Sequence, residues 1–91
     1  MVVTPYEHKQ ISDDTFMRTF AADADNSDLC WHRDREHRVV NVVEGKGWAL
    51  QLDNCLPLSL LPNREYFIPK EVYHRLIKGS TNLVLEITER K

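Results

Sequence analysis

The sequence predicts a small all-β protein built as an antiparallel sandwich or barrel. Short runs rich in β-branched and aromatic residues alternate with turn-forming residues about every eight to twelve positions, which is typical of such folds. After residue 25, no segment shows a long helical period. A chain of 91 residues has room for one domain with a modest core.

The first 14 residues are polar and are interpreted as an N-terminal arm and a turn, so the barrel is expected over residues 15–91. The composition of residues 15–20, TFMRTF, favours a strand, and a short helix over residues 15–24 is the competing interpretation. Turn-forming Asp, Asn and Ser residues follow. The later strands are predicted at residues 29–34, 38–44, 47–53, 56–61, 64–69, 73–78 and 83–89.

Composition excludes several classes of protein. Twelve basic and fourteen acidic side chains give a net charge of -2, which argues against a nucleic-acid-binding protein. The chain has no apolar run long enough to span a membrane and no signal peptide at its start, so we expect a cytoplasmic protein without a membrane partner. Cys30 and Cys55 are too few for a disulfide framework.

A possible metal site follows from the spacing of His32 and Asp34. On a strand, side chains two positions apart lie on the same face, and Cys30 would share that face. A rigid strand can therefore direct two ligands to one metal ion. A third ligand must come from a distant strand, and His74, which begins a later predicted strand, is the obvious candidate.

Two segments resemble the motifs of the small cupins. In WHRDREHRVVNVVEGKGW, within residues 29–48, His32 matches the first histidine of the family's H-x-H pair, Asp34 stands in place of the second, and Gly45 matches the closing glycine. In NREYFIPKEVYHRLIKG, within residues 63–79, Pro69 and His74 match the second motif at the right spacing. The resemblance covers residues 29–89 and implies an antiparallel double-stranded β-helix, or jelly-roll, barrel.

The departures from these motifs bear on function. Arg38 stands where the family usually has a metal-binding Glu, and a cation there cannot be a ligand. It could instead bind the carboxylate of a substrate, or it could form an ion pair with Asp34. In the second motif, Asn63 and Glu71 replace glycines and Lys78 replaces the final Asn.

The remaining set of His32, Asp34 and His74 is similar to the 2-His-1-carboxylate triad of non-haem Fe(II) oxygenases, which share the barrel. His37 is an alternative ligand, because a longer loop could direct it to the metal. The expected cofactor is one divalent transition metal, with Fe, Mn, Ni and Zn left open. Replacing His74 with alanine is expected to remove the metal at little cost to the fold.

The resemblance implies three candidate functions. The first is an Fe(II)-type dioxygenase acting on a small carboxylate-bearing metabolite, held by Arg38. The second is an isomerase or lyase in which the metal acts as a Lewis acid. The third is a binding protein without catalysis that holds a small, anionic ligand; the missing Glu and the presence of Arg38 motivate it.

Packing expectations follow from strand alternation. An exposed apolar surface is expected around Trp31, so we expect a homodimer that covers it. The other members of that surface are Phe16, Phe20, Val39 and Val43. The expected lining and core of the barrel are Trp48, Leu50, Leu52, Phe67, Val40, Val42, Leu85 and Ile87.

Overall fold

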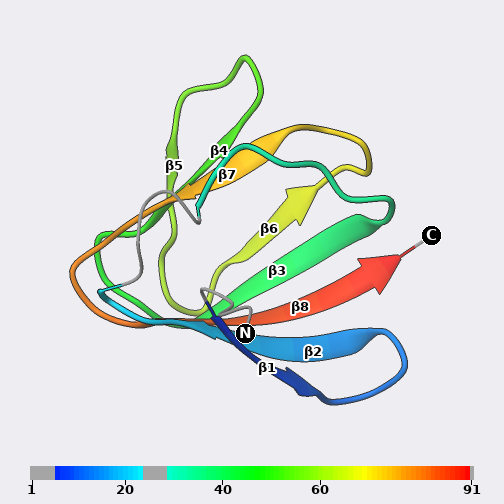
Figure 1. The fold of residues 1–91 in the computed structure, drawn as a ribbon, viewed down its shortest axis with the longest axis horizontal. Helices are drawn as coiled ribbons and strands as arrows, with labels where there is room; N and C mark the ends of the chain where they lie inside the picture. Colours follow the sequence, from blue (N-terminus) through cyan, green and yellow to red (C-terminus); the bar gives the residue numbers. More distant parts are fainter. Residues whose placement is uncertain (1–5, 24–28, 91) are drawn as a thin grey trace, which may run out of the picture.

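The computed structural model describes residues 6–23 and 29–90, and within them the protein is all-β. Two antiparallel sheets face each other across the core (Figure 1). A five-stranded sheet has the order β1-β2-β8-β3-β6, and a three-stranded sheet has the order β5-β4-β7. The strands are β1 (Tyr6–Gln10), β2 (Thr15–Phe20), β3 (His37–Glu44), β4 (Ala49–Leu52), β5 (Leu58–Ser59), β6 (Glu65–Ile68), β7 (His74–Ile77) and β8 (Leu83–Arg90).

Most predicted strands are confirmed. Residues 15–20 form β2 and pair with β8, so the alternative helix is wrong. Part of the expected N-terminal arm, residues 6–10, forms β1 and extends the sheet beyond β2. The strand expected at residues 29–34 is wrong, because this segment makes only one isolated bridge, at His32. The described part of the chain contains no helix that could span a membrane.

The core lies between the two sheets and is built by alternate residues of the strands. Trp48, Leu50 and the inward residues of β3 and β8 are buried, as expected. Among the described residues, the buried apolar side chains are Phe16, Phe20, Leu29, Val40, Val42, Trp48, Leu50, Leu60, Ile68, Leu83, Leu85 and Ile87. Apolar packing between two sheets is therefore the main stabilising interaction of this fold.

Three aromatic residues lie on the opposite face from the one expected. Phe16 and Phe20 are buried, because the alternation of β2 directs both toward the core. They therefore do not belong to an exposed surface, and the homodimer stays a prediction. Phe67 was expected in the core but is 53% exposed, because it pairs with Val39 on the outer face while Ile68 points inward. Trp31 is exposed as expected.

Gly79 allows a close approach between two segments of backbone. A Cβ atom at this position would clash with the carbonyl oxygen of Lys46 and with the backbone nitrogen and ring of Trp48. Backbone atoms cannot rotate away as a flexible side chain can. Gly79→Ala is therefore expected to lower the free energy of unfolding by about 1–3 kcal/mol. Urea denaturation checks this, with the exposed Ser80→Ala as the control; equal stability of both variants would contradict it.

Candidate metal centre

His74 is the buried member of the candidate centre. It is the first residue of β7, and only 3% of its surface is exposed. Its Nδ1 atom lies 2.9 Å from the backbone oxygen of Val72. Because a carbonyl can only accept a hydrogen bond, Nδ1 carries a proton, and Nε2 is the nitrogen that faces the carboxylate of Asp34. The backbone of the turn before β7 thus orients the ring so that Nε2 is the nitrogen that could bind a metal.

His32 is held beside His74 by the backbone. The amide nitrogen of His32 donates to the carbonyl of His74 at 3.0 Å, and the amide of His74 donates back at 2.8 Å. The side chain of His32 repeats the arrangement of His74, with Nδ1 2.9 Å from the oxygen of Cys30. The two rings make an edge-on contact with centroids 4.3 Å apart. Each ring therefore has the partner that fixes a ligand histidine, and neither partner was foreseen from the sequence.

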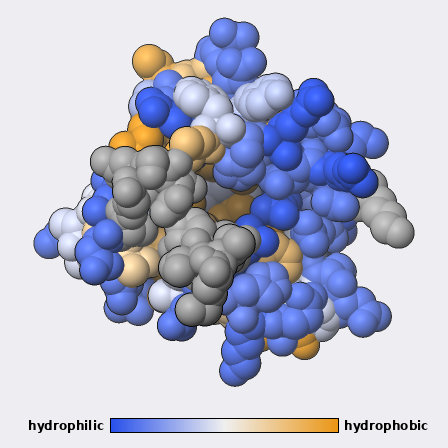
Figure 2. Space-filling model, viewed as in Figure 1, coloured by the Kyte–Doolittle hydropathy of each residue, from blue (hydrophilic) through white to orange (hydrophobic). Residues whose placement is uncertain are grey.

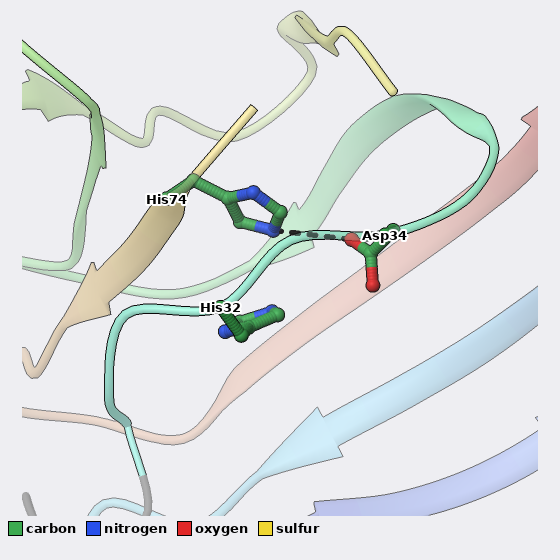
Figure 3. Close-up of side chains that lie close together, drawn as sticks. All are labelled: His32, Asp34 and His74. Carbon is green, nitrogen blue, oxygen red and sulfur yellow. Dashed lines mark ion pairs between the residues drawn. The ribbon is translucent and has the colours of Figure 1, made fainter. Parts of the chain in front are cut away.

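Asp34 completes the cluster from the loop between His32 and β3. Its backbone oxygen accepts from the amide of Glu71 at 2.7 Å, which ties this loop to the turn before β7. Its Oδ2 atom lies 3.2 Å from Nε2 of His74 (Figure 3), yet it is buried without a hydrogen bond of good geometry in the described residues. The carboxylate oxygen and the imidazole nitrogen therefore face each other without a well-aligned proton between them.

The electrostatic surroundings keep Asp34 ionised. Burial alone would raise the pKa of this carboxyl, but the contact with His74 and the charge of Arg38 together outweigh burial and lower the pKa below its usual value. A carboxylate that stays charged can act as a metal ligand at neutral pH. The lowered pKa also means that Asp34 stabilises the fold above its unfolded pKa, and that this contribution is lost as the pH falls through the folded value.

These three residues fit a divalent transition metal. One ligand atom from each of His32, Asp34 and His74 lies within 4.8 Å of the other two. Two ligand atoms that each lie about 2.1 Å from one ion can be at most about 4.2 Å apart. Small rotations of the three side chains would therefore bring their ligand atoms within reach of one ion. Two imidazoles with one carboxylate suit Fe, Mn, Ni and Zn. Oδ2 of Asp34, which is buried without a hydrogen bond of good geometry, is the atom that a metal ion would bind.

Arg38 occupies the position next to this cluster, and the expected ion pair is present. One guanidinium nitrogen lies 3.4 Å from Oδ2 of Asp34, and the other lies 3.1 Å from Glu89. Arg38 points inward from β3, as the motif position implied, and most of its side chain is buried. Two carboxylates therefore balance the charge of Arg38, which weakens the interpretation that it binds a substrate carboxylate.

The alternative ligand and the nearby thiol lie elsewhere. His37 points to the outer face of β3, where its ring stacks on Phe67 and Nδ1 accepts from the amide of Lys70. This follows from alternation, because Arg38 takes the inward position. Cys30 is exposed, and its backbone oxygen faces Nδ1 of His32. The structure therefore brings together His32, Asp34 and His74, and their role as metal ligands stays a prediction.

A cavity of about 100 Å³ lies between the sheets behind the two imidazoles. Figure 2 shows a hollow on this face of the molecule with an apolar floor. Four lining residues are cationic or can become so, namely Arg18, His32, Arg38 and His74. The other lining residues are apolar: Phe20, Leu29, Val40, Leu50, Leu60, Ile68, Leu76, Leu85 and Ile87.

Arg18 is the one cavity residue with a charge that sequence reasoning missed. The signal was available, because Arg18 alternates with Phe16 and Phe20 in β2 and must share their inward face. An outer surface at those two phenylalanines, as expected from the sequence, would put Arg18 outside as well. The same error therefore affected the core and the cavity.

Comparisons with solved structures identify the fold. A cupin domain from Bordetella pertussis Tohama I matches with a TM-score of 0.66 and 19% identity over 100% of this chain and 99% of that chain. An RmlC-like cupin with a double-stranded β-helix fold from Methanocaldococcus jannaschii matches with a TM-score of 0.69 and 11% identity over 97% and 82%. The DMSP lyase DddQ from Ruegeria pomeroyi DSS-3 matches with a TM-score of 0.68 and 13% identity over 88% and 40%.

No family model matches the chain, and no curated protein matches it. The chain spans less than half the length of the lyase that it matches. The structural matches nevertheless agree on one architecture, so this protein has the double-stranded β-helix fold of a small cupin.

Proposed function

We propose that this protein binds one divalent transition metal through His32, Asp34 and His74 and uses it on a small carboxylate-bearing metabolite. The observation that carries the proposal is the arrangement of the three side chains. Both imidazoles have Nδ1 paired to a backbone carbonyl, and the intervening carboxylate oxygen is buried without a well-aligned hydrogen bond. A structural ion pair alone would not require two histidines oriented in the same way.

The first candidate reaction is an Fe(II)-type oxygenation. Three ligands from the protein leave other positions of a metal open, and the bound metal would supply the redox chemistry. The protein's own contribution is to position the candidate ligands and the cavity beside them. His74 is buried, Asp34 is partly buried, His32 is exposed, and the cavity behind them has largely apolar walls. Arg38 and His74 both contact Oδ2 of Asp34 and so hold this carboxylate in position.

The second candidate is a redox-neutral lyase or isomerase reaction, supported by the likeness to a DMSP lyase. In this case the bound metal would polarise a substrate oxygen. The ion pair between Arg38 and Asp34 motivates a third candidate, a protein that binds a small ligand without catalysis.

Metal uptake tests the proposal. The protein, purified without a metal-affinity tag and stripped with a chelator, is titrated calorimetrically with Fe(II) under argon and with Mn(II), Ni(II) and Zn(II). We expect one equivalent per chain for at least one metal, and weaker binding at acidic pH because protons compete for the imidazoles. No uptake of any of the four metals would overturn the proposal. Oxygen consumption by the Fe(II)-loaded protein with a panel of small carboxylates then separates the first candidate from the second.

A further inference from the structure

The guanidinium of Arg38 is shared unequally between two carboxylates. Its Nη2 atom donates a hydrogen bond to Oε2 of Glu89 at 3.1 Å. Its Nη1 atom lies 3.4 Å from Oδ2 of Asp34, and this oxygen has no hydrogen bond of good geometry in the described residues. A charge-assisted hydrogen bond is stronger than an ion contact of poor geometry. Of the two carboxylates, Glu89 therefore holds the guanidinium more firmly.

The backbone explains this inequality. Arg38 and Glu89 lie directly opposite each other in the register of β3 and β8, so their side chains are neighbours on the same face. The amide of Glu89 also donates to the carbonyl of Asp14 at 2.8 Å, which fixes this end of β8. Asp34, by contrast, lies in the loop before β3. The pair with Glu89 is part of the sheet, whereas the contact with Asp34 depends on where the loop places its carboxylate.

Arg38 would lose little by moving away from Asp34. Its Nε atom is buried and has no hydrogen-bond partner within residues 6–23 and 29–90. Its central carbon lies 5.7 Å from the centroid of the Phe16 ring. A buried donor without a partner is unfavourable, so the present position does not satisfy the guanidinium fully. A shift toward Glu89 would break no side-chain hydrogen bond of good geometry that the structure shows for Arg38.

Arg38 and a metal would compete for the same atom. Oδ2 of Asp34 faces Nε2 of His74 at 3.2 Å, and Nη1 of Arg38 contacts this oxygen too. A metal about 2.1 Å from Oδ2 would lie at most about 5.5 Å from Nη1. Two cations at this distance repel each other, and more so in mostly buried surroundings than in water. Metal binding therefore requires a second carboxylate that can hold Arg38.

We propose that Glu89 is a positioning residue that sets the metal affinity of the centre by holding Arg38 off Asp34. In the metal-free protein, the guanidinium acts as an internal cation that contacts both carboxylates. When a metal takes the charge of Asp34, Arg38 stays bound to Glu89 alone. This inference rests on the proposed function, and it adds a residue that would not touch the metal.

Calorimetric titration of the chelator-stripped, full-length protein with Zn(II) tests the inference. Glu89→Gln should weaken Zn(II) binding by about 10-fold, because Arg38 is then left with Asp34 as its only carboxylate partner. Glu89 is partly exposed, so the variant is expected to fold. The control is Glu86→Gln, which removes the same charge from the outer face of β8. It should change the affinity by less than about twofold.

A double-mutant cycle separates an effect through Arg38 from a direct attraction between Glu89 and the metal. In the Arg38→Gln background, Glu89→Gln should change Zn(II) affinity by less than about threefold, because no guanidinium remains to be held. A direct attraction between the carboxylate and the metal would instead persist when Arg38 is absent. A loss in this background as large as the loss in the wild type would overturn the inference. Equal affinities of the wild type and Glu89→Gln would overturn it too.

A measurement without metal tests the same positioning role. Asp34→Asn removes the charge of this carboxylate, as a bound metal would balance it, and keeps the size of the side chain. We expect the Nη hydrogens of Arg38 to keep separate NMR signals in this variant, because Glu89 still restrains rotation of the guanidinium. Adding Glu89→Gln should merge or broaden these signals. Merged signals in folded Asp34→Asn alone would overturn the inference.

The two experiments distinguish this inference from the proposed function. A protein that takes up no metal in any variant contradicts the metal centre, and the metal-free NMR measurement still decides whether Glu89 holds Arg38. A protein that binds Zn(II) equally well with and without the carboxylate of Glu89 contradicts only the role of Glu89.

Discussion

Replacing His32 with alanine is expected to abolish measurable metal binding and to leave the fold intact. Loss of one of three ligands should weaken binding by about 100-fold or more, since even the loss of a group that only orients a ligand costs 10–100-fold. His32 is exposed, and its bridge to His74 uses backbone atoms that alanine retains. The free energy of unfolding of the metal-free protein should therefore change by less than about 0.5 kcal/mol.

His74→Ala should lose the metal equally but should also destabilise the fold. His74 is buried, so the expectation from sequence that its removal costs little is wrong. The variant leaves the carbonyl of Val72 without its partner and removes the imidazole that contacts Asp34, at a cost of about 1–3 kcal/mol. The control is His37→Ala, which removes an imidazole from the outer face. Calorimetric titration with Zn(II) and urea denaturation with a chelator measure both quantities. Full metal occupancy in either ligand variant would contradict the assignment.

Replacing Arg38 with glutamate is expected to have opposite effects on the metal-free and metal-loaded protein. Without metal, the variant places a third carboxylate beside Asp34 and Glu89 in a mostly buried position. Breaking a buried pair in this way typically costs about 3–5 kcal/mol. With metal, the cation that competes for Asp34 is gone and a carboxylate is added. Metal affinity should therefore rise by about 10-fold or more.

The measurements are urea denaturation with a chelator and with saturating Zn(II), together with calorimetric titration. We expect the added metal to recover most of the stability that the substitution removes, because a ligand that binds only the folded state stabilises it. Arg64→Glu makes the same change of charge in an exposed turn and controls for net charge. Where the metal-free variant is too unstable to titrate, Arg38→Gln provides the test. Unchanged or weaker affinity would mean that residue 38 does not act on the metal centre.

Strand periodicity predicted most of the fold, since seven of the structure's strands overlap predicted segments. The errors arise where alternation alone does not say which face is inside. In β2, Phe16, Arg18 and Phe20 share one face with a charge in its middle, and this pattern resembles a half-exposed surface. Only pairing with β8 on one side and β1 on the other places that face against the core.

The clustering of His32, Asp34 and His74 was predictable from the motifs, but the reason for their geometry was not. His32 and Asp34 lie near each other without a regular strand, because backbone bonds to β7 and to the turn at Glu71 hold the segment. Glu71 itself takes a left-handed backbone, φ 61°, at a position where the cupin motif has glycine. Such pairings between distant segments leave no signal in a single sequence.

The backbone bridge between His32 and His74 also bears on how the protein would acquire its metal. Main-chain hydrogen bonds set the spacing of the two imidazoles. These side chains are therefore preorganised and would lose little conformational entropy when a metal binds. The affinities of such a site for divalent ions are expected to follow their general order, in which copper and zinc bind more tightly than iron or manganese. The metal carried by the protein would then reflect the supply in the cell that makes it. Expression in media enriched in a single metal would therefore yield the same folded protein loaded with that metal. Comparing the activities of these preparations would identify the ion that the reaction requires.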